Sequence, residues 1–156
     1  MKVLVVGVGS RIRGDDEAGP RVCDILNERI GNGESPDFGT IEVIDSDVMP
    51  ENFSRPIRES RADITVFVDA GDMGVEPGGI RKIPLDKIGA TLPSTHTLPL
   101  NLFIDHISED VGETIVLGIQ AGSTGLFTEI SDEVSDACKR LADMIWNNDL
   151  DSIDSA

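Results

Sequence analysis

Runs of apolar residues alternate with amphipathic segments along most of the chain. Continuous aliphatic and β-branched runs are typical of strands that are buried on both faces of a parallel sheet. These runs predict strands over 2–6, 39–47, 62–72 and 112–120, the third of which ends its core at Asp69. Residues 80–85 predict an edge strand, because Pro84 cannot donate to a ladder in the middle of a sheet.

Apolar residues at helical spacing fill the segments between these runs. They predict helices over 16–30, 49–60, 97–109 and 129–146. Either Asp15 or Asp16 is the expected N-cap of the first helix, and Pro20 falls in its first turn, where a missing N–H is harmless. Residues 148–156 form a polar tail that we expect to fray.

Strands that alternate with helices predict the α/β class. We expect a three-layer sandwich in which a twisted, mostly parallel sheet of about five strands carries helices on both faces. The length of 156 residues, with no repeat or linker, predicts a single domain over 1–147 and the tail over 148–156. Sites in such sheets lie beyond the carboxyl ends of the strands, where the winding direction reverses.

The charge of the chain narrows the classes of partner. Its formal charge is −16, from 29 acidic and 13 basic residues. Binding to phosphate depends on Lys and Arg displacing counterions, so this surface repels nucleic acid and anionic lipid and favours a basic partner segment. No apolar run is long enough to span a membrane, and no signal-peptide cleavage site follows the first run, so we expect a cytoplasmic protein.

Three polar features gather at predicted strand ends. Asp16 follows the first strand, Asp69 ends the third, and His96 precedes a helix. If the first and third strands are neighbours, Asp16 and Asp69 face one crevice and His96 enters it from the side. Two carboxylates and one imidazole form a ligand set that suits a divalent transition ion and leaves coordination positions open.

Each of these residues also has a simpler interpretation. Asp15 or Asp16 can be a helix cap, although one cap does not need both. Asp69 can be a turn residue at a strand end, and His96 can hydrogen-bond a loop. The combination of the three at one edge of the sheet is what favours a site.

Other chemistries fit the sequence less well. Gly7 and Gly9 match the start of a dinucleotide-binding loop, but Ile12 occupies the third glycine position. Carboxylates at the helix start would also repel a pyrophosphate, by about 4 kcal/mol at ~4 Å and an intermediate dielectric. Ser123 lacks the spacing of a nucleophile elbow. Cys23 and Cys138 fit no zinc motif and are expected to be buried, inert thiols.

Four blocks of sequence carry a resemblance that spans most of the chain: "VGVGSRIRGDDEAGPRV", "VFVDAGDMGVEPGGIR", "STHTLPLNLFIDHI" and "GETIVLGIQ". Together they closely resemble the [NiFe]-hydrogenase maturation endopeptidases, nearest to the hydrogenase 3 type. The family pattern differs at Ser10, where asparagine is common, and at Glu17, where glycine is common. Neither difference removes a candidate ligand, although substrate choice or loop geometry can change.

The resemblance implies an α/β fold and a peptidase of aspartyl or metal-dependent type. Its expected activity is to remove the C-terminal extension of a [NiFe]-hydrogenase large-subunit precursor after nickel insertion. Matched by motif, Asp16, Asp69 and His96 are the implied catalytic and nickel-sensing residues, and the nickel is carried by the precursor. Either nickel polarises the scissile carbonyl or a carboxylate activates water.

The sequence is also compatible with two alternatives from other classes. The first is a non-catalytic chaperone that binds the precursor, and the second is a Rossmann-like dinucleotide-binding domain. The sequence leaves the particular hydrogenase, the cleaved bond and the oligomeric state open, and a monomer is compatible with it.

Overall fold

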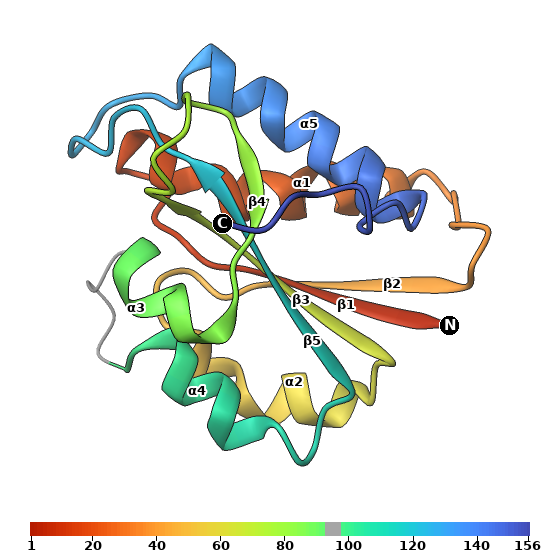
Figure 1. Cartoon of the computed structure of the whole chain (residues 1–156). Coiled ribbons are helices and arrows are strands. Elements are labelled where there is room, and N and C mark those ends of the chain that lie inside the picture. The colour runs from red at the N-terminus through yellow and green to blue at the C-terminus, as the bar shows by residue number, and fades with distance from the viewer. Residues whose placement is uncertain (93–97) are drawn as a thin grey trace.

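A five-stranded sheet forms the middle layer of the computed structural model, which describes residues 1–92 and 98–156 (Figure 1). Its strands are β1 (Lys2–Gly7), β2 (Thr40–Asp45), β3 (Ile64–Gly71), β4 (Ile80–Lys82) and β5 (Glu113–Gln120). The spatial order is β2-β1-β3-β5-β4. All neighbours pair in parallel except β4, which lies antiparallel to β5 at the edge. The predicted sheet is therefore confirmed, including its edge strand.

Helices cover both faces of the sheet, as predicted for a three-layer sandwich. On one face lie α1 (Ala18–Gly31) and α5 (Asp132–Trp146), and on the other lie α2 (Ser54–Ser60), α3 (Ile88–Thr91) and α4 (Leu100–Ile107) (Figure 1). Short 3-10 turns precede several of them: η1 (Gly14–Glu17), η2 (Pro50–Phe53) and η3 (Leu85–Lys87).

Alternation along β1 divides its side chains between two cores. Val3 and Val5 pack with the helices α1 and α5, whereas Leu4 and Val6 pack with α2, α3 and α4. All four are almost completely buried, because helices cover both faces of the sheet. The unbroken apolar run at the start of the chain follows from this double burial.

Several element boundaries differ from those predicted. Strand β3 is shorter than the predicted 62–72, and it continues past the predicted end of its core at Asp69, because Ala70 and Gly71 still pair with β5. Helix α5 begins at Asp132, because the side chain of Ser131 caps it by accepting from the N–H of Val134 at 3.4 Å. The predicted helix over 97–109 is observed as α4, and its expected first residue lies outside the described residues.

The prediction that residues 148–156 fray is wrong. Leu150 and Ile153 are buried against the α1–α5 side of the sheet. The backbone N–H of Lys82 donates to the carbonyl of Asp154 at 2.9 Å, and that of Ala156 donates to the carbonyl of Lys82 at 2.8 Å. The tail therefore runs beside the edge strand β4 and satisfies its outer backbone groups.

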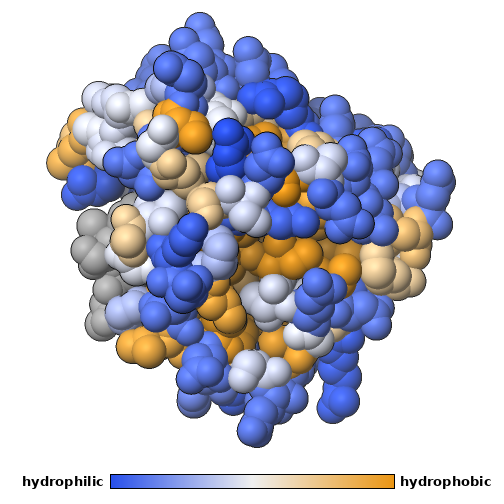
Figure 2. All heavy atoms as spheres, viewed as in Figure 1, coloured by the Kyte–Doolittle hydropathy of each residue, from blue (hydrophilic) through white to orange (hydrophobic). Residues whose placement is uncertain are grey.

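The surface beside this edge mixes polar and apolar groups. Figure 2 shows hydrophobic side chains exposed between hydrophilic ones over the part of the molecule where Figure 1 draws β5 and the C-terminal segment. Elsewhere on the face shown, hydrophilic residues dominate, in keeping with the high charged fraction of the chain. Within 1–92 and 98–156, no helix has the length and apolar character needed to cross a membrane.

A first prediction follows from the packing of the tail. Ile153→Ala should lower the free energy of unfolding by about 2 kcal/mol, because a buried branched side chain is lost and a cavity is left. Urea unfolding followed by circular dichroism measures this. The control is Asp154→Asn, an exposed neighbour whose backbone contact is kept, and which should unfold like the wild type. Equal stability of both variants and the wild type would mean that the tail is not packed in solution.

Candidate active site

The candidate site lies where the winding direction of the sheet reverses. The chain leaves β1 for β2 on one side, while β3 lies on the other side of β1. The end of β1 is tied to β3, because the N–H of Val8 donates to the carbonyl of Val68 at 2.9 Å. The condition that the first and third strands are neighbours is therefore met, and the segments that follow both strands lie at one edge of the sheet.

Glycines allow the chain to approach itself closely at this edge. A Cβ on Gly19 would lie 2.4 Å from the carbonyl oxygen of Val68 and 2.5 Å from that of Val8. Gly9 has a φ of +150°, and a Cβ there would lie 1.9 Å from the carbonyl oxygen of Asp16. These positions therefore need glycine for backbone packing, and the packing holds η1 against the end of β3.

Asp15 is fully buried and binds a distant loop. Its carboxylate accepts backbone N–H groups from Gly122 at 2.7 Å, Ser123 at 3.0 Å and Ser131 at 2.7 Å. Burial alone would raise the pKa of this carboxyl, but the hydrogen bonds from Ser131, Ser123 and Gly122 outweigh it and lower the pKa below its usual value. The ionised carboxylate therefore fastens the loop that joins β5 to α5 onto η1.

The expected capping role of Asp15 or Asp16 is not found. Neither η1 nor α1 has a side-chain hydrogen bond at its N-cap. Instead, Asp16, which is 7% exposed, accepts the backbone N–H of Ser10 on one carboxylate oxygen at 2.8 Å. The sequence could not show the partners of Asp15, because they lie more than a hundred residues further along the chain.

Asp69 is fully buried within β3, opposite Gly118 of β5. Its interpretation as a strand-end turn residue is therefore wrong. Asp69 and η1, which carries Asp16, lie at the same edge, because η1 packs against β3. The third candidate, His96, lies outside the described residues. Among the residues that are described, no three His, Cys, Asp or Glu side chains form a group that could hold a metal.

A cavity of about 520 Å³ lies beside the same ends of β3 and β5. Its lining combines the end of β3, helix α3 and the loop after β5: 70–72, 89–92, 120–122 and Thr124. Gln120 fixes part of this wall, because its side-chain oxygen accepts the N–H of Met73 at 2.7 Å. The cavity opens beside strand residues that directly follow Asp69.

Exposed apolar side chains lie on the loops next to η1. Phe127 is 79% exposed, and Ile12 and Leu126 are each 50% exposed. The two loops are joined by the N–H of Phe127, which donates to the carbonyl of Ile12 at 2.6 Å. The rim of the site is therefore partly apolar in a chain of high charge.

The thiols provide no nucleophile. Cys23 and Cys138 are fully buried, and burial raises the pKa of each to about 12. At neutral pH both are protonated, and a protonated thiol is a poor nucleophile. The prediction of two buried, inert thiols is confirmed.

A family model described as "Hydrogenase maturation protease" (HycI) matches residues 20–148. The chain belongs to the hydrogenase maturation protease family. Asp69 and His96 lie within the matched residues, and Asp16 lies just before them. The predicted family and the prediction of a peptidase are confirmed.

Relatives of this family in bacteria and archaea are similar over most of their length. The chain is 39% identical over 138 residues to the hydrogenase 3 maturation protease of Escherichia coli strain K12. The aligned region covers 88% of this chain and 84% of the relative. It is 30% identical over 137 residues to a putative hydrogenase maturation protease of Methanocaldococcus jannaschii. This aligned region covers 85% of this chain and 79% of the relative.

Solved structures of the family share the fold. The solution structure of the endopeptidase HycI from Escherichia coli gives a TM-score of 0.81 at 34% identity, covering 99% of this chain and 96% of that one. The crystal structure of the [NiFe] hydrogenase maturation protease HycI from Thermococcus kodakarensis KOD1 gives a TM-score of 0.79 at 34% identity. The match covers 93% of this chain and 90% of that one.

A second prediction follows from the way the Asp15 carboxylate anchors the loop after β5. Asp15→Asn removes the charge and leaves one accepting oxygen, so we expect the free energy of unfolding to fall by about 1–3 kcal/mol near neutral pH. The folded pKa is lowered, so the carboxylate stabilises the fold above the unfolded pKa of about 3.9, and this contribution is lost as pH falls through the folded value. The difference between variant and wild type should therefore shrink in acid.

Urea unfolding of both proteins across the acidic and neutral range tests this. Asp136→Asn removes the same charge from an exposed position on α5 and is the matched control. A constant difference at every pH would contradict an ionised anchor.

Proposed function

We propose that this hydrogenase maturation protease removes the C-terminal extension of a [NiFe]-hydrogenase large-subunit precursor once nickel has been inserted. In this proposal, Asp16, Asp69 and His96 recognise the nickel that the precursor carries and act in cleavage. The observation that carries it is the placement of two buried carboxylates, from η1 and β3, at the switch point of the sheet. Membership of the family supplies the class of reaction and of substrate.

The donor set suits the proposed guest ion. Carboxylate oxygens and an imidazole nitrogen are ligands that a divalent transition ion accepts, and three of them leave positions for ligands from the precursor. The nickel belongs to the substrate, so it acts as both recognition signal and positioning device. A precursor without nickel would then dock weakly and escape premature cleavage.

Two routes to peptide hydrolysis fit these residues. The nickel can polarise the scissile carbonyl, or a carboxylate can take the proton of the attacking water as a general base. A covalent thiol route is disfavoured by the buried, protonated cysteines. The cavity beside β3 and β5 offers room for the peptide segment of the precursor next to Asp69.

Carboxylate substitutions test the proposal directly. Asp16→Asn and Asp69→Asn should each lower the rate of precursor shortening by about 100-fold or more, because a ligand and a potential base are both lost. The measurement is shortening of the large subunit on a gel, with nickel-loaded and nickel-free precursor side by side. Asp86→Asn removes the same charge from an exposed turn and should cleave like the wild type.

The outcomes separate the proposal from its rivals. Equal cleavage of both precursor forms by the wild type would end the idea that nickel is sensed. Wild-type protein that binds the nickel-loaded precursor and never shortens it would favour a non-catalytic chaperone. Unchanged cleavage by Asp16→Asn would remove that residue from the site.

The cavity can be tested independently. Ala90→Trp places a large side chain in its wall, so the KM for nickel-loaded precursor should rise about tenfold while the thermal midpoint stays close to that of the wild type. Steady-state cleavage kinetics measure this. The matched control is Asn101→Trp, which adds a similar ring on α4 outside the cavity lining. Equal KM values for all three proteins would place the peptide elsewhere.

A further inference from the structure

Arg11 joins three segments that are distant in the sequence. It lies on the loop between β1 and η1, and its guanidinium makes two hydrogen bonds of 2.8 Å with Asp24 of α1. One of its nitrogens also donates to Asp45, the last residue of β2, at 2.7 Å. The loop is therefore tied to a helix and to a strand of the scaffold.

This arrangement is more specific than an ordinary surface ion pair. A planar guanidinium that binds one carboxylate through two parallel N–H groups fixes both distance and orientation. The hydrogen bonds to Asp24 and Asp45, opposed only in part by burial, raise the pKa of Arg11, so the group stays charged. The side chain is still 45% exposed, and exposed pairs add little to stability by themselves.

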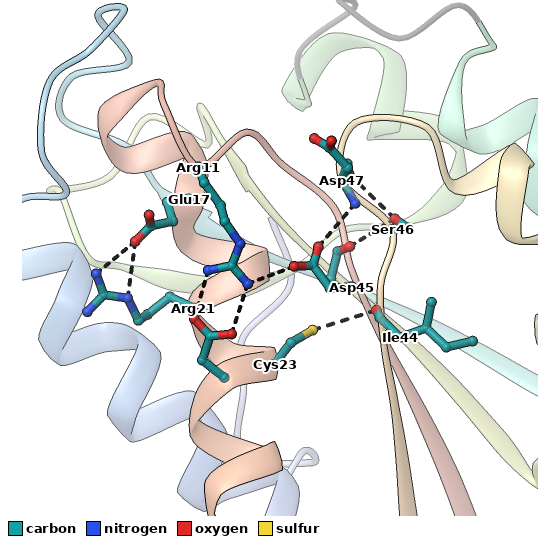
Figure 3. Close-up of polar contacts among 10 residues, drawn as sticks. Arg11, Glu17, Arg21, Cys23, Ile44, Asp45, Ser46 and Asp47 are labelled. Atoms are coloured by element: carbon teal, nitrogen blue, oxygen red, sulfur yellow. Dashed lines mark hydrogen bonds and ion pairs between the residues drawn. The ribbon is translucent and has the colours of Figure 1, made fainter.

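A second set of contacts fixes the same loop at its start. The N–H of Gly9 donates to the carbonyl of Asp47 at 2.9 Å, and the N–H of Asp47 donates to a carboxylate oxygen of Asp45 at 3.1 Å. Asp45 therefore binds Arg11 with one carboxylate oxygen and the Asp47 backbone with the other (Figure 3). Both ends of the short segment 9–11 are therefore held by residues at and just after the end of β2.

Ser10 lies between these two fixed points, and it contacts the side chain of Asp16. Its backbone N–H donates to a carboxylate oxygen of Asp16 at 2.8 Å. A shift of the segment 9–11 would therefore move or break this hydrogen bond. Glu17, which follows Asp16, is separately paired with Arg21 of α1 at 2.7 Å (Figure 3).

We propose that Arg11 is a positioning residue of the protease, which clamps the segment 9–11 to α1 and β2 so that the Ser10 N–H orients the Asp16 carboxylate toward the precursor's nickel. This role rests on the proposed function. A purely structural Arg11 would affect only the stability of the fold, and precursor cleavage would then stay unchanged while the protein is folded.

The first experiment compares three arginine variants. Arg11→Gln should lower kcat/KM for nickel-loaded precursor about tenfold, and Arg11→Lys should lie between it and the wild type, because lysine keeps the charge and loses the planar fork. Arg55→Gln is the control, since it breaks an exposed pair with Glu59 on α2. We expect it to cleave like the wild type. Thermal unfolding of all four proteins shows that each is folded at the assay temperature.

The second experiment asks whether Arg11 acts through Asp16. Affinity for nickel-loaded precursor is measured for the wild type, Arg11→Gln, Asp16→Asn and the double variant. We expect Arg11→Gln to weaken binding several-fold in the wild type and to have no further effect once Asp16 is Asn. If the fold-losses in affinity of the two single variants multiply in the double variant, the positioning role is wrong. Cleavage by Arg11→Gln at the wild-type rate would also overturn it.

These outcomes distinguish failure of the two proposals. If the wild type leaves nickel-loaded precursor intact, the proposed function fails and the role of Arg11 falls with it. If the wild type cleaves in a nickel-dependent way and Arg11→Gln matches it, only the role of Arg11 is wrong.

Discussion

The buried Asp15 carboxylate is the interaction on which the geometry of the site edge depends. In a parallel sheet, the carboxyl ends of the strands are followed by loops that have no ladder to hold them. Asp15 accepts three backbone N–H groups from the loop after β5 and so binds that loop to the turn after β1. Because Asp16 is the next residue, its position is fixed by the same contact.

Carboxylates also make a glycine-rich turn after a strand unfavourable for phosphate in this chain. An anion site at such a turn needs backbone N–H groups that point at the ligand. In this chain, Asp15 occupies the N–H groups of Gly122, Ser123 and Ser131, and Asp16 accepts that of Ser10. The protein therefore supplies its own anions at the turn, and the edge favours a cation.

Much of the fold could be predicted from periodicity, and the missed features are those that depend on distant contacts. The run from Val3 to Val6 shows burial on both faces, and the alternation of strands with helices predicts the layers. The strand that carries Asp69 was predictable for the same reason, whereas its place beside the first strand was only a condition of the predicted site. The last nine residues hold only two large apolar side chains, too few for a periodic signal, so the burial of Leu150 and Ile153 could not be predicted.

The residues of the candidate site likewise fall into those that could be predicted from the sequence and those that could not. Asp16 and Asp69 could be placed at this edge of the sheet because both lie near the carboxyl ends of buried strands, and the position of a strand in the sequence is a local property. Asp15 and Arg11 could not be assigned roles, because their partners come from other elements. A weak set of donors gains selectivity when it is rigidly placed, since little ordering is left to do on binding. Under the proposed function, the fixed carboxylates would hold nickel only when ligands from the precursor complete its coordination.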